Sequence, residues 1–373
     1  MTSAPGWSFD LTSEVRTVLS WGLPGTTGSH RPALDDAGWH TFRAEVERHR
    51  LLGLLVAAVA DEAIETSPDQ AAEVARLEVD LTLVRMWQEA RFPLVVADLE
   101  QAGIDVRVLK GPAFGALDYV DAQLRPTSDL DLLVRADDID AAAARLETAG
   151  ALRVDPDPTP GYAATVGKGA TLALPDGLEV DLHRTLVWGP FGVRIRTEDL
   201  WERSRTFELA GNPVQAMDLE SSLLHACYHL LVLGYRRALS LRDVAQMLLA
   251  PELDPDRVLR LARRWTGEAA LAAGVLLAVD ELGLTTDSIL VGWAAGYAPR
   301  LRERLWMRVE RPEAQIGPLE PLVTYQALRT PAERAVLRRA TVQPVPGTWA
   351  TPTERVERVR RRLAALAGSV RGG

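Results

Sequence analysis

Cysteine is nearly absent from this chain of 373 residues, which carries Cys227 alone. One thiol cannot close a disulfide within the chain, so a disulfide scaffold is excluded and a reducing, cytoplasmic setting is expected. Long apolar runs are missing too. The longest uncharged ones, such as Leu51–Ala60 and Ala269–Val279, fall far short of the ~20 residues that span a bilayer. The first residues show no basic segment followed by an apolar one, so we expect neither a secretory signal nor a membrane partner.

Lysine is scarce as well, because only Lys110 and Lys168 occur beside 40 arginines. Charge is unevenly spread around a net value of −9: residues 297–373 carry 15 Arg and 7 Glu, or +8, which leaves −17 for the remainder. The acidic balance argues against a general nucleic-acid coat. The basic C-terminus indicates either a docking surface for an anionic partner or simply a solvated helical face.

Composition is that of an ordinary globular protein, with 47% hydrophobic and 25% charged residues. Apolar residues recur at helical spacing over Leu34–Ala60 and Ala71–Gly103, and Pro93 is expected to kink or divide the second stretch. The period then changes. Residues 104–109 and 128–134 alternate as strands, a helix is expected over 137–149, and Pro175-Asp176-Gly177 predicts the turn of a β-hairpin.

The helical period returns at Asp218, and an amphipathic helix is predicted at 356–370. The expected fold class is therefore α+β, a central mixed sheet flanked by helical regions. We predict four segments: a helical region 1–102, an α/β domain 103–216, a helical domain 217–310 and a basic helical segment 311–373.

The most informative segment is Arg125-Pro-Thr-Ser-Asp-Leu-Asp-Leu-Leu-Val134. Because residues i and i+2 share one face of a strand, Asp129 and Asp131 are expected side by side. Two such carboxylates repel each other unless a cation lies between them, and hard oxygen ligands suit Mg²⁺. Asp181, in the later Glu-Val-Asp-Leu-His strand, joins them if the two strands pair. Asp-x-Asp alone is a weak signal, since most instances are solvent-facing strand edges or turns.

Taken together, these motifs resemble the nucleotidyltransferase superfamily of DNA polymerase beta and the kanamycin nucleotidyltransferases. More narrowly, the chain is similar to a largely uncharacterised bacterial family whose pattern is Lys-Gly, then Arg-Pro-x-Ser-Asp-x-Asp, then Asp-Leu-His. The matching residues are Lys110-Gly111, Arg125–Asp131 and Asp181–His183. Pro112 departs from the superfamily, which usually has Ser or Gly there, and it removes one backbone N–H.

The resemblance implies transfer of a nucleoside monophosphate from a nucleoside triphosphate, the co-substrate, to an acceptor, with release of pyrophosphate. Asp129, Asp131 and Asp181 are then the catalytic and metal-binding residues, holding two Mg²⁺ ions. The same resemblance assigns the β- and γ-phosphates to a further set of residues. That set is Lys110, Gly111, Arg125, Ser128 and Lys168.

The acceptor is left open by the sequence: a small molecule, a peptide, a protein or a tRNA. A non-catalytic module that binds a nucleotide or a partner on the same fold is the alternative function. His225 and His229 lie four residues apart on an apolar helix and could share a metal, but no third ligand lies at suitable spacing, so packing is favoured. His183 is expected either to contact the acceptor or to support Asp181.

Overall fold

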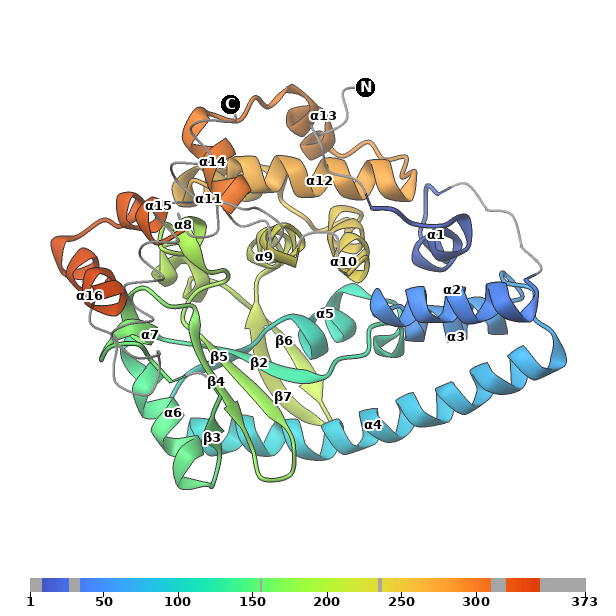
Figure 1. Cartoon of the computed structure of the whole chain (residues 1–373), viewed down its shortest axis with the longest axis horizontal. Coiled ribbons are helices and arrows are strands. Elements are labelled where there is room, and N and C mark those ends of the chain that lie inside the picture. Colours follow the sequence, from blue (N-terminus) through green and yellow to red (C-terminus); the bar gives the residue numbers. More distant parts are fainter. Residues whose placement is uncertain (1–8, 27–33, 155, 234–236, 310–319, 343–373) are drawn as a thin grey trace, which may run out of the picture.

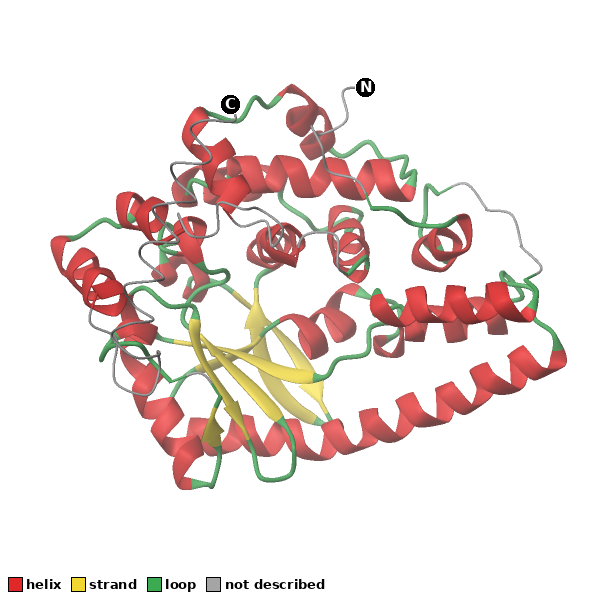
Figure 2. Ribbon diagram, in the orientation of Figure 1, coloured by secondary structure: helices red, strands yellow, loops and turns green. Residues whose placement is uncertain are grey.

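The computed structural model describes residues 9–26, 34–154, 156–233, 237–309 and 320–342. In this part of the chain, helices surround one mixed β-sheet, which confirms the expected α+β class (Figures 1 and 2). The helix predicted at 356–370 lies outside the described residues. Within them, no helix combines the length and the apolar character needed to cross a membrane.

Four helices precede the sheet: α1 (Ser13–Ser20), α2 (Asp36–Arg48), α3 (Leu52–Ala60) and α4 (Pro68–Gln101). Asp35 caps the N-terminus of α2, where its side chain accepts a hydrogen bond from the Gly38 N–H. The stretch predicted as helical from Leu34 to Ala60 is divided at Arg50, whose φ of 60° is left-handed. This break brings Arg50 to the edge of the cleft described below.

The long helix α4 runs along one edge of the molecule (Figure 1). The expected division at Pro93 is wrong, because α4 continues through this residue to Gln101. An internal proline removes a single helical hydrogen bond. The residues around it, Phe92, Val95 and Val96, are buried in one core with the sheet, and this packing supports the helix on both sides of Pro93.

The sheet has seven strands in the order β3-β4-β5-β2-β1-β7-β6. Two neighbouring pairs, β2 with β5 and β1 with β7, are parallel, and the other pairs are antiparallel. The strands are β1 (Val106–Val108), β2 (Asp129–Val134), β3 (Leu152–Arg153), β4 (Gly169–Ala173), β5 (Glu179–His183), β6 (Ser204–Leu209) and β7 (Asn212–Met217). The β4–β5 pair is the hairpin predicted at residues 175–177.

Alternation along β2 gives the sheet an apolar face and a polar face. Leu130, Leu132 and Val134 lie in a buried core with α4 and α6 (Ile139–Thr148). By the period of two, Asp129 and Asp131 lie on the opposite face. That face is covered by α5 (Lys110–Asp118) and by the helices that follow the sheet (Figure 1).

The β6–β7 hairpin was missed by the sequence interpretation. Its register pairs Leu209 with Asn212, which leaves Ala210 and Gly211 as a two-residue loop with φ values of 49° and 77°. Both values are positive, as a type I′ turn requires. Such turns favour Asn-Gly or Asp-Gly, so alanine at the first position weakened the local signal.

Beyond the sheet the chain is helical again. α9 (Leu219–Leu233) is capped by Asp218, whose Oδ1 accepts the Ser221 N–H at 2.9 Å. The other helices are α10 (Leu239–Leu248), α11 (Pro255–Trp265), α12 (Glu268–Leu282), α13 (Ile289–Gly296), α14 (Leu301–Val309), α15 (Glu320–Ala327) and α16 (Pro331–Val342). Short helical segments connect the remaining parts: η1 (Ala122–Leu124), η2 (Ala136–Asp138), α7 (Tyr162–Thr165), α8 (Gly189–Gly192) and η3 (Thr197–Trp201). The division into four segments stays a prediction.

Candidate active site

The two acidic strands, β2 and β5, are parallel neighbours in the sheet. Their register sets Asp131 opposite Asp181 and Asp129 opposite Glu179. Because the period along each strand is two, Asp129, Asp131, Asp181 and His183 all lie on the same face. The sequence interpretation depended on this strand pairing, and the structure contains it.

Asp131 is buried, with 3% of its surface exposed. Its Oδ1 lies 2.7 Å from the ammonium of Lys110 and 2.7 Å from Nε2 of His183. Burial alone would raise the pKa of this carboxyl group, but the nearby Lys110 charge and the His183 hydrogen bond hold the pKa well below its usual range. Asp131 is therefore a carboxylate at neutral pH. Both contacts are made by its Oδ1, so its Oδ2 can bind another group.

Burial lowers the pKa of His183 to about 4, and the Lys168 ammonium adds to this shift. The imidazole is neutral at pH 7, so its Nε2–H is the donor to Asp131. This contact orients the Asp131 carboxylate, and the burial of His183 keeps it from direct contact with solvent. The geometry favours a supporting role for His183 over contact with an acceptor.

Asp181 lies beside this pair and has its own partners. Thr171 donates to its Oδ1 at 2.5 Å, and the Lys168 ammonium lies 3.4 Å from its Oδ2. Burial alone would raise the pKa of Asp181, but the Lys168 charge, His183 and the Thr171 hydrogen bond together lower it. Ligand atoms of Asp131, Asp181 and His183 lie within 4.8 Å of one another, close enough to share one metal ion.

Asp129 stands at the solvent side of this group, half-buried at the start of β2. Its Oδ1 accepts hydrogen bonds from Thr127 at 3.3 Å and Ser128 at 3.4 Å. The Ser128 hydroxyl in turn accepts a hydrogen bond from Arg50 at 3.0 Å. Asp131 and Asp181 bring two carboxylates together, and Asp129 lines the same cleft as Asp131. Carboxylate oxygens are the hard donors that Mg²⁺ prefers, so the residues present fit this ion.

Lys110 and Gly111 form the first residues of α5. Lys110 adopts a left-handed φ of 41°, and this sharp turn points the chain from β1 into the helix. Pro112 is the third residue of α5, where a backbone N–H has no partner within the helix, so the proline leaves the helical hydrogen bonds intact.

Gly111 has no room for a side chain, because a Cβ would lie 2.3 Å from Oγ1 of Thr127. We expect Gly111→Ala to displace Thr127 from Asp129 and to lower the free energy of unfolding by about 1–3 kcal/mol through overpacking. Urea unfolding measures this effect. Gly292→Ala is the matched control, since its helical Cβ meets nothing within 4 Å and the change should be neutral or stabilising. Equal effects at both positions would contradict this account.

Arg125, assigned to phosphates by the resemblance, is bound to Asp243 instead. Its Nε and Nη2 donate to the two carboxylate oxygens at 2.7 and 2.8 Å, and Tyr119 donates to the same carboxylate at 2.8 Å. Burial alone would lower the pKa of Arg125, but the charge of Asp243 and its hydrogen bonds together raise it. Through this bidentate pair, the segment that precedes Asp129 is anchored to Asp243 on α10. The geometry therefore favours a positioning role for Arg125.

A polar cleft of about 40 Å³ lies beside these groups. Asp129, Asp131, Lys110 and Gly111 line it together with residues that sequence reasoning missed. The missed residues are Arg50, Arg237, Leu239 and Ser240, and His229 and Asp243 line the cleft as well. Two of them, Arg50 and Arg237, add cationic groups to the cleft. In the sequence, Arg50 precedes the first strand of the sheet and Arg237 follows the last one. No local motif marks either arginine, because each reaches the cleft only through the fold.

His225 and His229 both lie on α9, where His229 lines the cleft and His225 does not. His225 is fully buried, and its ring lies edge-on to those of Phe114, His183 and His229. Burial holds the pKa of His225 well below its usual range, so the ring is neutral. His229 lies closer to the cleft, with its Nδ1 3.2 Å from the Ser240 hydroxyl.

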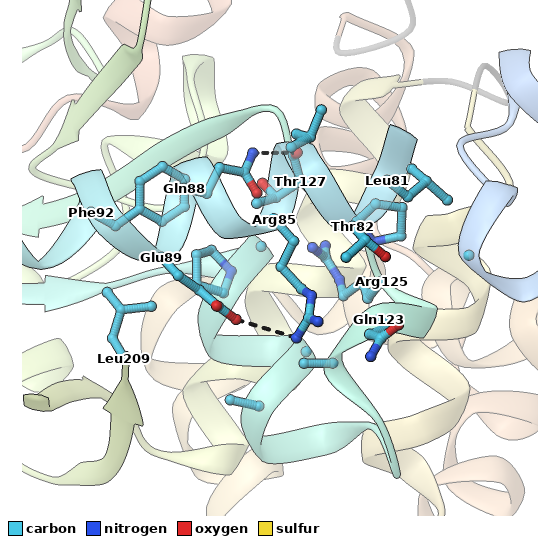
Figure 3. Close-up of a pocket in the computed structure, with 18 of the residues that line it drawn as sticks. Leu81, Thr82, Arg85, Gln88, Glu89, Phe92, Gln123, Arg125, Thr127 and Leu209 are labelled. Carbon is cyan, nitrogen blue, oxygen red and sulfur yellow. Dashed lines mark hydrogen bonds and ion pairs between the residues drawn. The ribbon is translucent and has the colours of Figure 1, made fainter. Parts of the chain in front are cut away.

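A second, larger pocket of about 190 Å³ adjoins the cleft (Figure 3). Gly111 and the segment 125–127 line both cavities and form the wall between them. On its other side, α4 contributes Arg85, Gln88 and Glu89, with an ion pair of 3.3 Å between the first and the last. Gln88 donates to the Thr127 carbonyl at 2.7 Å, which connects α4 to the wall.

Comparison with known proteins decides the family. A family model described as uncharacterised nucleotidyltransferase matches residues 35–283, about two thirds of the chain. The chain belongs to this nucleotidyltransferase family. The match confirms the family and the enzyme class expected from the sequence, and it spans the cleft and the second pocket. A search of curated proteins gave no match.

Several solved structures resemble this nucleotidyltransferase at low identity. A solution structure of the antibiotic-resistance factor ANT(2'')-Ia is 15% identical, with a TM-score of 0.28, and the match covers 52% of this chain and 91% of that one. A crystal structure of the same factor with adenylyl-2''-tobramycin is 14% identical, with a TM-score of 0.28 over 52% and 97% of the two chains. An antigenic nucleotidyltransferase-like protein from Paracoccidioides brasiliensis is 16% identical, with a TM-score of 0.33 over 53% and 92%.

Proposed function

We propose that this nucleotidyltransferase moves a nucleoside monophosphate from a nucleoside triphosphate to an acceptor hydroxyl or phosphate, with release of pyrophosphate. The observation that carries the proposal is the register that sets Asp131 opposite Asp181, with Asp129 on the same face and Lys110 against the pair. Asp129, Asp131 and Asp181 would hold Mg²⁺, which when bound would neutralise charge on the phosphates and on the attacking oxygen.

In the proposed reaction, the acceptor oxygen forms a bond with the α-phosphorus while the bond from that phosphorus to the bridging oxygen of pyrophosphate breaks. The proton of an acceptor hydroxyl passes to Asp181, whose Oδ2 lies 3.4 Å from the Lys168 ammonium and 3.9 Å from Nε2 of His183. Lys110, Arg50 and Arg237 would bind the β- and γ-phosphates, where negative charge develops as pyrophosphate leaves.

The second pocket offers a place for the acceptor. It shares the wall of Gly111 and residues 125–127 with the cleft, so a molecule bound there lies next to the aspartates. Its apolar surface, which includes Leu81, Phe92 and Leu209, suits a molecule with an apolar part beside hydrogen-bonding groups.

Ala116 lines the second pocket on the exposed side of α5, and Ala116→Leu narrows this pocket. We expect this change to lower acceptor-dependent turnover by at least about tenfold, the effect of losing one or two methylene contacts with the acceptor. Binding of the nucleoside triphosphate should be unchanged. Turnover is measured as pyrophosphate release with an acceptor, and nucleotide binding as the shift in melting temperature. A loss of both together would place Ala116 at the nucleotide instead.

Thermal unfolding with each nucleoside triphosphate, with and without Mg²⁺, tests the proposed function together with pyrophosphate release. A ligand that binds the folded state raises the melting temperature by mass action. We expect a Mg²⁺-dependent shift with at least one triphosphate and pyrophosphate release once an acceptor is supplied. A shift without pyrophosphate release from any acceptor class supports the non-catalytic alternative, and no shift with any triphosphate contradicts both.

A further inference from the structure

Helix α4 carries large apolar side chains on its outer face. Val79, Leu83, Met86, Trp87 and Leu94 are between 37% and 59% exposed. Their spacing of three, four or seven residues, with Met86 and Trp87 adjacent, places them in one stripe of the helix. In Figure 1 most of the described chain lies on one side of α4, while the turn of the β4–β5 hairpin and one end of α6 reach past it.

This stripe is additional to the face that packs α4 on the protein. Phe92, Val95, Val96 and Leu99 are buried on the inner face. The five outer side chains together present roughly 500 Å² of apolar surface, near the upper end of the largest patch on a typical monomer. That is more than half of the about 800 Å² that each partner buries in a standard interface. A stripe of this size indicates an interaction surface.

We propose that the outer face of α4, Val79 to Leu94, binds the same face of a second copy of this chain in an antiparallel dimer. The stripe is symmetric about a point between Met86 and Trp87, because Val79 and Leu94 lie at equal distances from it. A two-fold interface requires such a self-complementary surface. Each Leu83 then faces the exposed Ala90 of the other copy, a large residue against a small one.

Charges beside the stripe match the same arrangement. Arg76 and Asp80 precede the midpoint. Arg91 and Asp98 follow it at similar distances, where they already form ion pairs within the chain, Arg91 with Asp176 and Asp98 with Arg145, at 2.5 Å each. An antiparallel second copy would therefore add Arg76 to the Asp98–Arg145 pair of the other chain and Asp80 to its Arg91–Asp176 pair. This is the polar rim around an apolar centre that protein interfaces typically have.

The mass of the full chain in solution, from sedimentation velocity, tests the dimer. We expect twice the mass of one chain at micromolar concentration and the mass of one chain for Leu83→Glu/Met86→Glu. Leu301→Glu is the matched control, since that side chain is 77% exposed on α14 and away from α4, and its mass should stay that of the dimer. A single-chain mass for the unmutated protein up to 100-fold higher concentration overturns the proposal, as does a dimer that survives the α4 double substitution.

Cross-linking fixes the orientation. Met86→Cys lies next to the proposed two-fold axis, and Cys227, the only natural thiol, is fully buried. Mild oxidation should therefore convert Met86→Cys to a disulfide-linked dimer and leave Leu301→Cys as single chains. Equal cross-linking of both variants would indicate random collision and would refute the antiparallel contact.

Discussion

Asp131→Asn is expected to abolish nucleotidyl transfer, with a fall in pyrophosphate release of roughly 10³-fold. A bound metal ion stabilises the charge of the transition state by several kcal/mol, and each ~1.4 kcal/mol is a factor of ten in rate. Asp131 is the central carboxylate of the group: Lys110 and His183 both bind it, and it lies opposite Asp181. The neutral amide keeps the shape of the side chain and removes its charge. The Mg²⁺-dependent shift in melting temperature with nucleoside triphosphate should disappear as well.

Asp105→Asn is the matched control for this experiment. Asp105 is an exposed carboxylate whose partner is Arg135, 3.2 Å away on the surface. The Asp105→Asn protein should therefore release pyrophosphate at the normal rate. Because Asp131→Asn leaves the Lys110 ammonium facing a neutral group, the melting temperature of the unliganded variant is measured alongside. A folded Asp131→Asn protein that keeps its rate within tenfold would remove Asp131 from the catalytic group.

Asp243→Asn should cause the largest loss of stability, about 3–5 kcal/mol of unfolding free energy, because it leaves the buried Arg125 guanidinium without its counter-charge. The two side chains are 7% and 2% exposed, and their bidentate contact anchors the segment that leads to Asp129. Urea unfolding provides the measurement. Activity should fall more than nucleotide binding, since the segment positions catalytic groups.

A double-mutant cycle separates this pair from general damage. We expect Arg125→Met/Asp243→Leu to recover part of the stability that either single charge removal loses, because neither charge is then buried alone. The exposed pair Arg135 and Asp105 serves as the comparison, where loss of one partner should cost no more than about 1 kcal/mol. Additive losses at Arg125 and Asp243 would show that the two groups do not interact.

The acidic part of the site could be predicted because its information is local. Strand alternation sets Asp129 beside Asp131, and the hairpin signal at 175–177 locates the strand with Asp181. Lys110 and Lys168 were also expected there and lie against the aspartates, but the arginines of the cleft could not be predicted. Arg50 reaches the cleft through a left-handed break between two helices, and Arg237 from the segment before α10. Arg125 was assigned to the phosphates because the motif shows only its neighbours in sequence. Its partner in the structure, Asp243, lies 118 residues away.

The fold shows the same limit. Helical and strand periods gave the central elements, but Pro93 was expected to divide a helix that tertiary packing keeps whole. The β6–β7 hairpin was overlooked because Ala210 takes a left-handed conformation that alanine rarely adopts alone. In both cases long-range packing outweighs a local preference, and a single sequence carries only the local preference.

The scarcity of lysine has a practical consequence for labelling this protein. Both lysine amines of the chain, on Lys110 and Lys168, lie against aspartates of the candidate site at 2.7 and 3.4 Å. Burial lowers the pKa of Lys168, so more of its amine is unprotonated and nucleophilic at neutral pH than on a surface lysine. Acylation of lysine side chains therefore takes place only beside the candidate site, and a support that couples through lysine would block that site.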